Sequence, residues 1–125
     1  MSRFSVKVLP GGCKFDLYAP NGQMIATSEV YDTRAACLKG VESVRKSAPS
    51  AGVEDLTEDN CPTLPHPKFQ LFLDKAGQFR FRLKARNGKI IAVSDGYQTK
   101  SGCENGIDSV RKNAPDAEIE EIAEM

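Results

Sequence analysis

The sequence predicts an α+β fold in which two tandem β(3)-α-β repeats form one continuous, mainly antiparallel sheet with two helices on one face. The first observation is an internal repeat: residues 12–48 and 78–114 are near-copies, and their Asn-Gly turns, at 21–22 and 87–88, lie 66 residues apart. The second is an apolar–polar alternation that is followed, in each copy, by one apolar stripe with helical spacing. The third is size, because a single unit of about 55 residues buries too little surface to be stable alone.

The first copy begins with three predicted strands joined by tight turns. Apolar residues alternate with polar ones over residues 4–8 and 13–18, the period of a half-buried strand, and a third short strand is expected over 24–28. Pro10-Gly11-Gly12 breaks the first run and supplies positive φ for the reversal. Asn21-Gly22 predicts a hairpin with a type I′ turn, in which both central residues have positive φ. Three strands connected in this way form an antiparallel meander.

A helix follows the meander. Thr33 is the predicted N-cap, whose hydroxyl accepts a hydrogen bond from the first turn of the helix. Gly40 lies within the apolar stripe although glycine lowers helix propensity, so we expect the helix backbone to approach the sheet closely there, as at Gly106 in the second copy. Pro49 ends the helix, and a short fourth strand is expected over 53–57. The stripe consists of Cys37, Gly40, Val41, Val44 and Ala48.

The second copy repeats this plan after a polar, proline-rich linker. Its helix is expected to begin after Thr99 and to end before Pro115. Its strands are predicted over residues 69–73, 79–85, 90–94 and 119–122. The chain is therefore interpreted as a single domain over residues 1–125, divided into repeat 1 (1–57), the linker (58–67) and repeat 2 (68–125).

Charge and apolar patterning exclude several classes of partner. Lys plus Arg equals Asp plus Glu, at 17 each, so no global field attracts nucleic acid or an anionic membrane, and such binding would need a local patch. The apolar runs are too short to span a bilayer. The first residues alternate rather than form the apolar core of a signal peptide. We therefore expect a cytoplasmic protein without membrane contact.

The four cysteines allow two disulfides in principle, but their placement favours reduced thiols. Cys37 and Cys103 are equivalent positions on the two helix stripes, where a thiol packs as a small apolar side chain. Cys13 is in phase with the apolar side of a strand, and Cys61 lies in the linker. No CxxC or Cys/His cluster occurs, so reduced, mostly buried cysteines are preferred over a disulfide framework.

The repeated motif resembles that of the YegP-like proteins, a bacterial family of unknown function. In the second copy the marks are Phe79–Ala85 (FRFRLKA), Asn87-Gly88, Ser94, Tyr97 and Gly106-Ile107-x-Ser109-Val110. The first copy matches at Phe15, Leu17, Ala19, Asn21, Gly22, Ser28, Tyr31, Gly40, Val41, Ser43 and Val44. The resemblance implies that the last strand of each repeat is exchanged into the other repeat. It implies no activity, cofactor or catalytic residue, and Lys14-Phe15-Asp16 departs from the Arg-Phe-Arg pattern.

A basic strand in the second copy is the first candidate binding patch. Its four cations alternate with apolar residues, so all four are expected on one side of the strand, spaced about 7 Å apart. Phe72 is in phase to stack a base on that side, which would suit a single-stranded nucleic acid. The competing interpretation is a solvated outer face, which the first copy supports with Lys14, Asp16, Tyr18 and Pro20 at the equivalent positions. The four cations are Arg80, Arg82, Lys84 and Arg86.

Tyr31 and Tyr97 are the second candidate, as anchors for a partner. They occupy equivalent positions just before the two helix caps. A tyrosine there either contacts a partner or packs against the start of its own helix, and the packing role is favoured.

No residue pattern predicts catalysis. Ser43 and Ser109 lie within the predicted helices with no neighbouring base, and the lone histidine, His66, lies between two prolines of the linker without an orienting group or further metal ligands. The sequence has no phosphate-binding glycine motif. We therefore expect neither an enzyme nor a cofactor or metal site.

The resulting hypothesis is a non-catalytic interaction module that acts through its open sheet face. Its partner is expected to be another protein, and the chain a monomer rather than a dimer. The alternative is single-stranded nucleic-acid binding through the basic strand.

Overall fold

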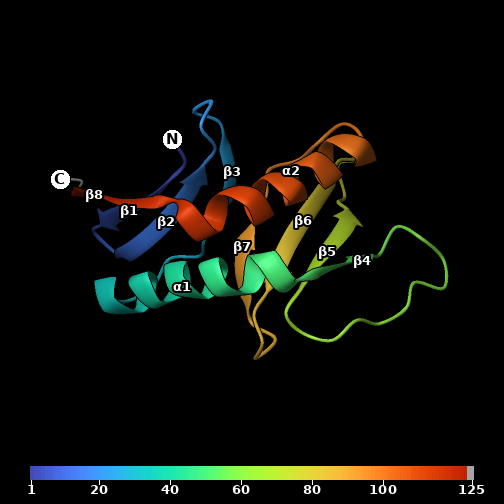
Figure 1. The fold of residues 1–125 in the computed structure, drawn as a ribbon, viewed down its shortest axis with the longest axis horizontal. Coiled ribbons are helices and arrows are strands. Elements are labelled where there is room, and N and C mark those ends of the chain that lie inside the picture. The colour runs from blue at the N-terminus through green and yellow to red at the C-terminus, as the bar shows by residue number, and fades with distance from the viewer. Residues whose placement is uncertain (124–125) are drawn as a thin grey trace.

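The computed structural model describes residues 1–123 and contains one eight-stranded sheet covered by two helices (Figure 1). The strand order is β4-β5-β6-β7-β3-β2-β1-β8. The first repeat contributes β1 (Arg3–Leu9), β2 (Gly12–Tyr18), β3 (Met24–Thr27), α1 (Arg34–Ser47) and β4 (Gly52–Asp55). The second contributes β5 (Lys68–Leu73), β6 (Phe79–Lys84), β7 (Ile90–Val93), α2 (Lys100–Asn113) and β8 (Glu118–Ala123). The predicted α+β repeat architecture is confirmed.

The last strand of each repeat lies in the half of the sheet built by the other repeat. β4 pairs in parallel with β5, and β8 pairs in parallel with β1. The remaining neighbours are antiparallel, and β3 and β7 join the two halves at Thr27 and Val93. The strand exchange implied by the family resemblance is therefore present, and each half of the sheet needs a strand from the other repeat.

Equivalent side chains from the two helices hold the exchanged strands. Arg111 of α2 donates to the Ala51 carbonyl just before β4 at 2.6 Å, and Arg45 of α1 donates to the carbonyl of Ala117 just before β8. At the start of α2, Lys100 pairs with Asp55 of β4 at 2.5 Å. The corresponding ion pair in the other half joins Arg34 of α1 to Glu121 of β8.

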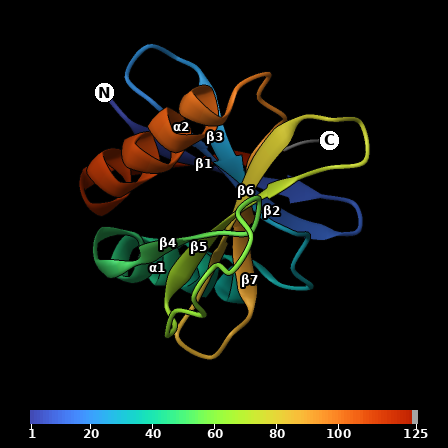
Figure 2. The same ribbon diagram turned by 90° about the vertical axis from the view of Figure 1, so that its right-hand side faces the viewer.

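Both helices cover the same face of the sheet (Figures 1 and 2). α1 packs on β1, β2 and β7, and α2 packs on β3, β5 and β6, so each helix spans the boundary between the halves. Phe4, Phe15, Phe69 and Phe81 are fully buried between these layers, in two edge-to-face pairs. The core is shared by the repeats, as the sequence predicted.

The predicted helix ends are confirmed. The Thr33 hydroxyl accepts from the Ala36 amide at 3.1 Å, and the Thr99 hydroxyl accepts from the Gly102 amide at 2.9 Å. Each helix changes to a short 3₁₀ turn that contains Pro49 or Pro115.

The hairpins at Asn21-Gly22 and Asn87-Gly88 are present, but the predicted type I′ turn is wrong. Only the glycine has positive φ, at 84° in both turns; among the described residues, Asn60 alone is a non-glycine residue with positive φ. The Gly22 amide donates to the Ala19 carbonyl at 2.9 Å, so the turn begins one residue earlier than predicted. This is a three-residue loop with glycine in the left-handed conformation. Pro20 suits the first central position, where its ring fixes a negative φ, but it is not required, because the second turn forms in the same way with Arg86 there.

Gly40 and Gly106 are required for close packing, as predicted, although tyrosine contributes the nearest atoms. A Cβ at Gly40 would lie 2.6 Å from the Tyr31 hydroxyl and 3.0 Å from the Phe15 ring. At Gly106 it would lie 2.4 Å from the Tyr97 hydroxyl. The helix thus rests on a tyrosine and on a phenylalanine of the sheet.

All four cysteines are free, as predicted, and three of them, Cys13, Cys37 and Cys103, are buried. Burial raises the pKa of the Cys37 thiol to about 12 and that of Cys103 to about 11, which keeps both thiols protonated and unreactive. Within the part of the chain that the structure describes, both helices are too short and too polar to span a bilayer.

Candidate functional site

Three of the four cations of the basic strand share the outer face of the sheet, opposite the helices. Phe81 and Leu83 point into the core, so Arg80, Arg82 and Lys84 of β6 point outward. Arg86 does not join them, because β6 ends at Lys84 and Arg86 lies in the following turn. The expected row of four equally spaced cations on one face is therefore wrong at its last member.

Arg80 and Arg82 have partners within the protein. The Arg80 Nε donates to Asp74 at 2.6 Å, and its guanidinium also reaches the Ser94 carbonyl at 3.2 Å. The Arg82 Nε donates to Gln70 at 2.7 Å, and its guanidinium carbon lies 4.8 Å from the centre of the Phe72 ring. Phe72 is on the predicted side, but one face of its ring is already covered by Arg82.

A buried polar network continues from Arg82 to the edge of the sheet. Gln70 donates to one carboxylate oxygen of Glu54 at 2.7 Å, while Lys68 and the Leu64 amide donate to the other at 2.7 and 2.8 Å. Only 5% of the Glu54 side chain and 6% of the Lys68 side chain are exposed. The hydrogen bond from Lys68, with those from Leu64 and Gln70, lowers the pKa of the Glu54 carboxyl to about 2.

In the other half of the same outer face, Asp16 is the carboxylate with which the neighbouring polar groups interact. Lys7 and Lys14 lie 3.2 and 3.4 Å from its carboxylate, and the Thr27 hydroxyl donates to it at 2.5 Å. Near the end of β2, the Arg3 guanidinium carbon lies 4.4 Å from the centre of the Tyr18 ring. Both halves of the outer face thus carry an arginine stacked on an aromatic ring.

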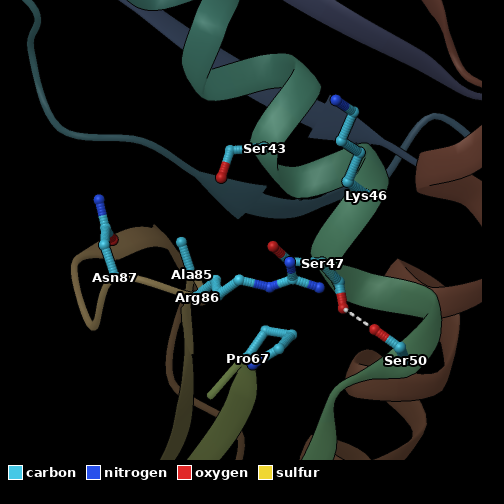
Figure 3. A pocket seen from close by; sticks show the side chains of 8 residues that line it. All are labelled: Ser43, Lys46, Ser47, Ser50, Pro67, Ala85, Arg86 and Asn87. Carbon is cyan, nitrogen blue, oxygen red and sulfur yellow. Dashed lines mark hydrogen bonds between the residues drawn. The ribbon is translucent and has the colours of Figure 1, made fainter.

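Arg86 points instead toward α1 (Figure 3). The turn between β6 and β7 and the C-terminal half of α1 enclose a cavity of about 360 Å³. Its lining includes Lys46 and three serines of α1 and the turn after it. The three serines are Ser43, Ser47 and Ser50.

Tyr31 and Tyr97 lie beneath the helices. The Tyr31 ring stacks on Phe15 with ring centres 6.3 Å apart, and Tyr97 stacks on Phe81 at 6.4 Å. Their backbones form isolated bridges to Cys13 and Phe79. Burial raises the pKa of both phenols. Both tyrosines therefore pack against their own helices, as favoured from the sequence. They remain partly exposed at the edge of the hydrophobic core.

The residues considered for catalysis are Ser43, Ser109 and His66, of which Ser43 lines the cavity described above. The Ser109 hydroxyl accepts a hydrogen bond from the Asn113 side-chain NH₂ at 3.0 Å, and His66 is exposed beside Gly88 of the β6–β7 turn. Within residues 1–123, no group of three or more His, Cys, Asp or Glu side chains is arranged to hold a metal ion.

The family of this chain is shown by its similarity to known proteins. The profile of a family described as "Domain of unknown function (DUF1508)" matches residues 11–55 and 74–121, once for each repeat. The chain belongs to this family.

DUF1508 relatives include proteins of one repeat and of two. A UPF0339 protein of Treponema denticola is 58% identical over 55 residues, which are 44% of this chain and 95% of that protein. The UPF0339 protein PA0329 of Pseudomonas aeruginosa is 33% identical over 111 residues, which are 89% of this chain and 87% of its own length.

Two solved structures of the family have the same fold. The Escherichia coli protein of unknown function yegP is 29% identical, with a TM-score of 0.79 over 99% of this chain and 95% of that one. UPF0339 protein SO3888 of Shewanella oneidensis is 27% identical, with a TM-score of 0.80 over 98% and 92% of the two chains. The YegP-like resemblance is confirmed.

Sequence reasoning missed the Glu54 network. The DUF1508 match stops at residue 55 and resumes at residue 74, so Leu64, Lys68 and Gln70 lie outside it. The available signal was the Lys68-x-Gln70-x-Phe72 phase of β5, which places two polar side chains on the outer face. The path of the linker, which brings Leu64 to Glu54, has no local signature.

Proposed function

We propose that this member of DUF1508 is a non-catalytic interaction module that binds a protein partner on the outer face of its sheet. The observation that carries the proposal is the pair of arginine–aromatic stacks, Arg82 on Phe72 and Arg3 on Tyr18, on the face that no helix covers. Arginine, tyrosine and phenylalanine are enriched in protein interfaces and among their strongest contacts. The stacks also hold these side chains in place before binding, which lowers the entropic cost of association.

The charges of this face favour a protein over a nucleic acid. Affinity for a phosphate backbone comes from cations that replace condensed counterions. Arg80 is bonded to Asp74, and Asp16 holds Lys14, so phosphates would compete with carboxylates already in place. A base that stacks on Phe72 would also compete with Arg82 for the ring. Single-stranded nucleic-acid binding through Arg80, Arg82 and Lys84 is therefore the alternative outcome of the test.

The experiment compares wild-type protein with the double variant R80S/R82S. Immobilised protein is used to capture partners from a cytoplasmic extract of the source cells, and the same samples are assayed by gel shift with a single-stranded oligonucleotide at several salt concentrations. The control K39S/K112S removes the same charge from exposed helix positions. Thermal melting monitored by circular dichroism establishes that each variant is folded.

We expect a reproducible protein partner that is captured by wild type and by K39S/K112S but lost from R80S/R82S. A shift whose log affinity falls linearly with log salt, and which R80S/R82S removes, would replace the protein-partner proposal by the nucleic-acid one. Capture that is unchanged in R80S/R82S would contradict a role for this face.

A further inference from the structure

The cavity between α1 and the β6–β7 turn is a second site, separate from the outer sheet face. We propose that it binds the phosphate monoester group of a small molecule, with Arg86 and Lys46 as the cationic ligands. It is formed only because the repeats are packed together: α1 belongs to the first repeat and the turn to the second. The proposal does not depend on the one above, since the two sites use different cations.

Arg86 distinguishes this cavity, because it alone among the arginines of residues 1–123 has no hydrogen bond or ion pair. Arg80, Arg45, Arg111 and Lys100 all have carboxylate partners. Among the described residues, by contrast, no ion pair or hydrogen bond involves the Arg86 guanidinium or the Lys46 ammonium, and no acidic side chain lines the cavity. Two cations match the charge of roughly −2 that a phosphate monoester carries near pH 7.

The remaining lining groups supply hydrogen-bond donors. The Asn87 Oδ1 accepts from the Lys89 amide at 3.0 Å, so the Asn87 side-chain NH₂ is the group left to face a ligand. In Figure 3 the Ser43 hydroxyl points toward the turn, Arg86 extends beneath α1 toward Ser47, and the Lys46 ammonium points away from Arg86. A planar guanidinium binds two phosphate oxygens at once, and a lysine on its flexible stem can reach a third.

The size of the cavity indicates a small ligand. Its volume of about 360 Å³ is at the lower end of the range for small-molecule sites. Pro67 and Ala85 add apolar wall on the side of the turn, which suits the organic part of an ester better than a free ion. A phosphodiester chain would require cations in a row, whereas this cavity is lined by two cations only, Arg86 and Lys46.

A groove in the other half, which shares the equivalent positions Ala19, Asn21 and Ser109 with this cavity, shows that the fold does not need Arg86. It lies between α2 and the β2–β3 turn and is lined by neutral side chains such as Asn21, Gln23 and Asn105. Pro20 occupies the position of Arg86, and the turn forms in the same way. Lys46 has an equivalent, Lys112, and both compensate the negative end of a helix dipole. The fold therefore does not explain why position 86 is an arginine.

The test is an NMR titration of the full-length, ¹⁵N-labelled protein with glycerol 3-phosphate, in parallel with inorganic phosphate and a single-stranded oligonucleotide. Sodium chloride at matched ionic strength is the reference. Backbone amides of residues 43–48, 50 and 85–89 and the Asn87 side-chain NH₂ report on the cavity. R86Q removes the guanidinium, while the control K112Q removes one cation of α2 that does not line the cavity.

We expect saturable shifts confined to the cavity with glycerol 3-phosphate at millimolar concentration or below. R86Q should weaken this affinity by about tenfold or more, as the loss of a charge-assisted contact implies, while K112Q leaves it unchanged. Tighter binding of the ester than of inorganic phosphate would support the small-molecule assignment.

Three results would overturn the proposal. The first is the absence of saturable shifts beyond those that sodium chloride causes. The second is equal binding by wild type and R86Q, whose unchanged amide spectrum away from residue 86 would show that it is folded. The third is cavity shifts caused by the oligonucleotide or by inorganic phosphate but not by the ester. Capture of a protein partner by R86Q does not test the phosphate site. Loss of a protein partner from R80S/R82S does not argue against that site either.

Discussion

The two halves of the sheet have the same topology but hold their exchanged strands in different ways. Glu54 of β4 and Glu120 of β8 are equivalent positions. Glu54 is buried and receives three hydrogen bonds, whereas the Glu120 side chain is 55% exposed and lies 3.6 Å from the Arg3 guanidinium. Two features cause the difference. The linker brings the Leu64 amide to Glu54, and β5 supplies Lys68 and Gln70 where the equivalent strand β1 has Arg3 and Ser5. The neighbouring segments, rather than the strand that carries the carboxylate, thus decide whether it is buried or solvated.

Removing each carboxylate in turn should give the largest difference in stability between the two halves. E54A leaves the Lys68 ammonium buried without its partner, and breaking a buried ion pair costs roughly 3–5 kcal/mol. E120A removes an exposed pair, whose contribution is about 0–1 kcal/mol. Urea unfolding of the two variants measures both values. Equal losses of stability in E54A and E120A would show that the halves do not differ in this way.

Acid should reveal the same asymmetry with a smaller effect, because protonated Glu54 still fills its site. The pKa of Glu54 is lowered in the folded protein to about 2, from an ordinary value of 4.5. Its contribution to stability is therefore complete above about pH 4.5 and is lost as the pH falls toward 2. Unfolding free energies measured across this window should decrease more steeply for wild type than for E54Q. Parallel curves would contradict the assignment.

Substitution of the helix glycines should affect the stability of the two halves equally. A methyl group at Gly40 or Gly106 would overlap a tyrosine hydroxyl, and such overpacking costs typically 1–3 kcal/mol, partly offset by the better helix propensity of alanine. G40A and G106A should therefore lose similar stability, on the order of 1 kcal/mol, in the same urea assay. Adding Y31A to G40A removes the overlap but also removes the stacking of Tyr31 on Phe15. The double variant should therefore be less stable than G40A alone. A stabilised G40A variant would show that the tyrosine moves aside without cost.

The sequence predicted the repeats, the strands, both helix caps and the shared core, because each depends on periodicity or on a residue a few positions away. Thr33 and Pro49 bound their helix whatever lies around it. The Asn-Gly turns were assigned to the wrong type, because the dipeptide alone does not show that the turn begins one residue earlier, at Ala19 and Ala85. Alternation alone could not separate Arg86 from Arg80 and Arg82, because alternation does not show where a strand ends.

The strand exchange came from the family resemblance, since alternation shows which residues face the core but not which strand is the neighbour. Burial of Glu54 could not be predicted at all. It depends on Leu64, which the linker brings to it by a path without secondary structure, and on Lys68 at the start of β5. The cavity at Arg86 likewise requires α1 and the β6–β7 turn, which come from different repeats.

The central claim is that neither half is complete without a strand from another repeat. Residues 1–57 and 58–125, produced as separate chains, test it by sedimentation and thermal melting at two protein concentrations. We predict that neither fragment folds as a monomer, and that mixing them gives a one-to-one complex whose melting temperature rises with concentration. A monomeric fragment that melts cooperatively at the temperature of the intact protein would contradict the account.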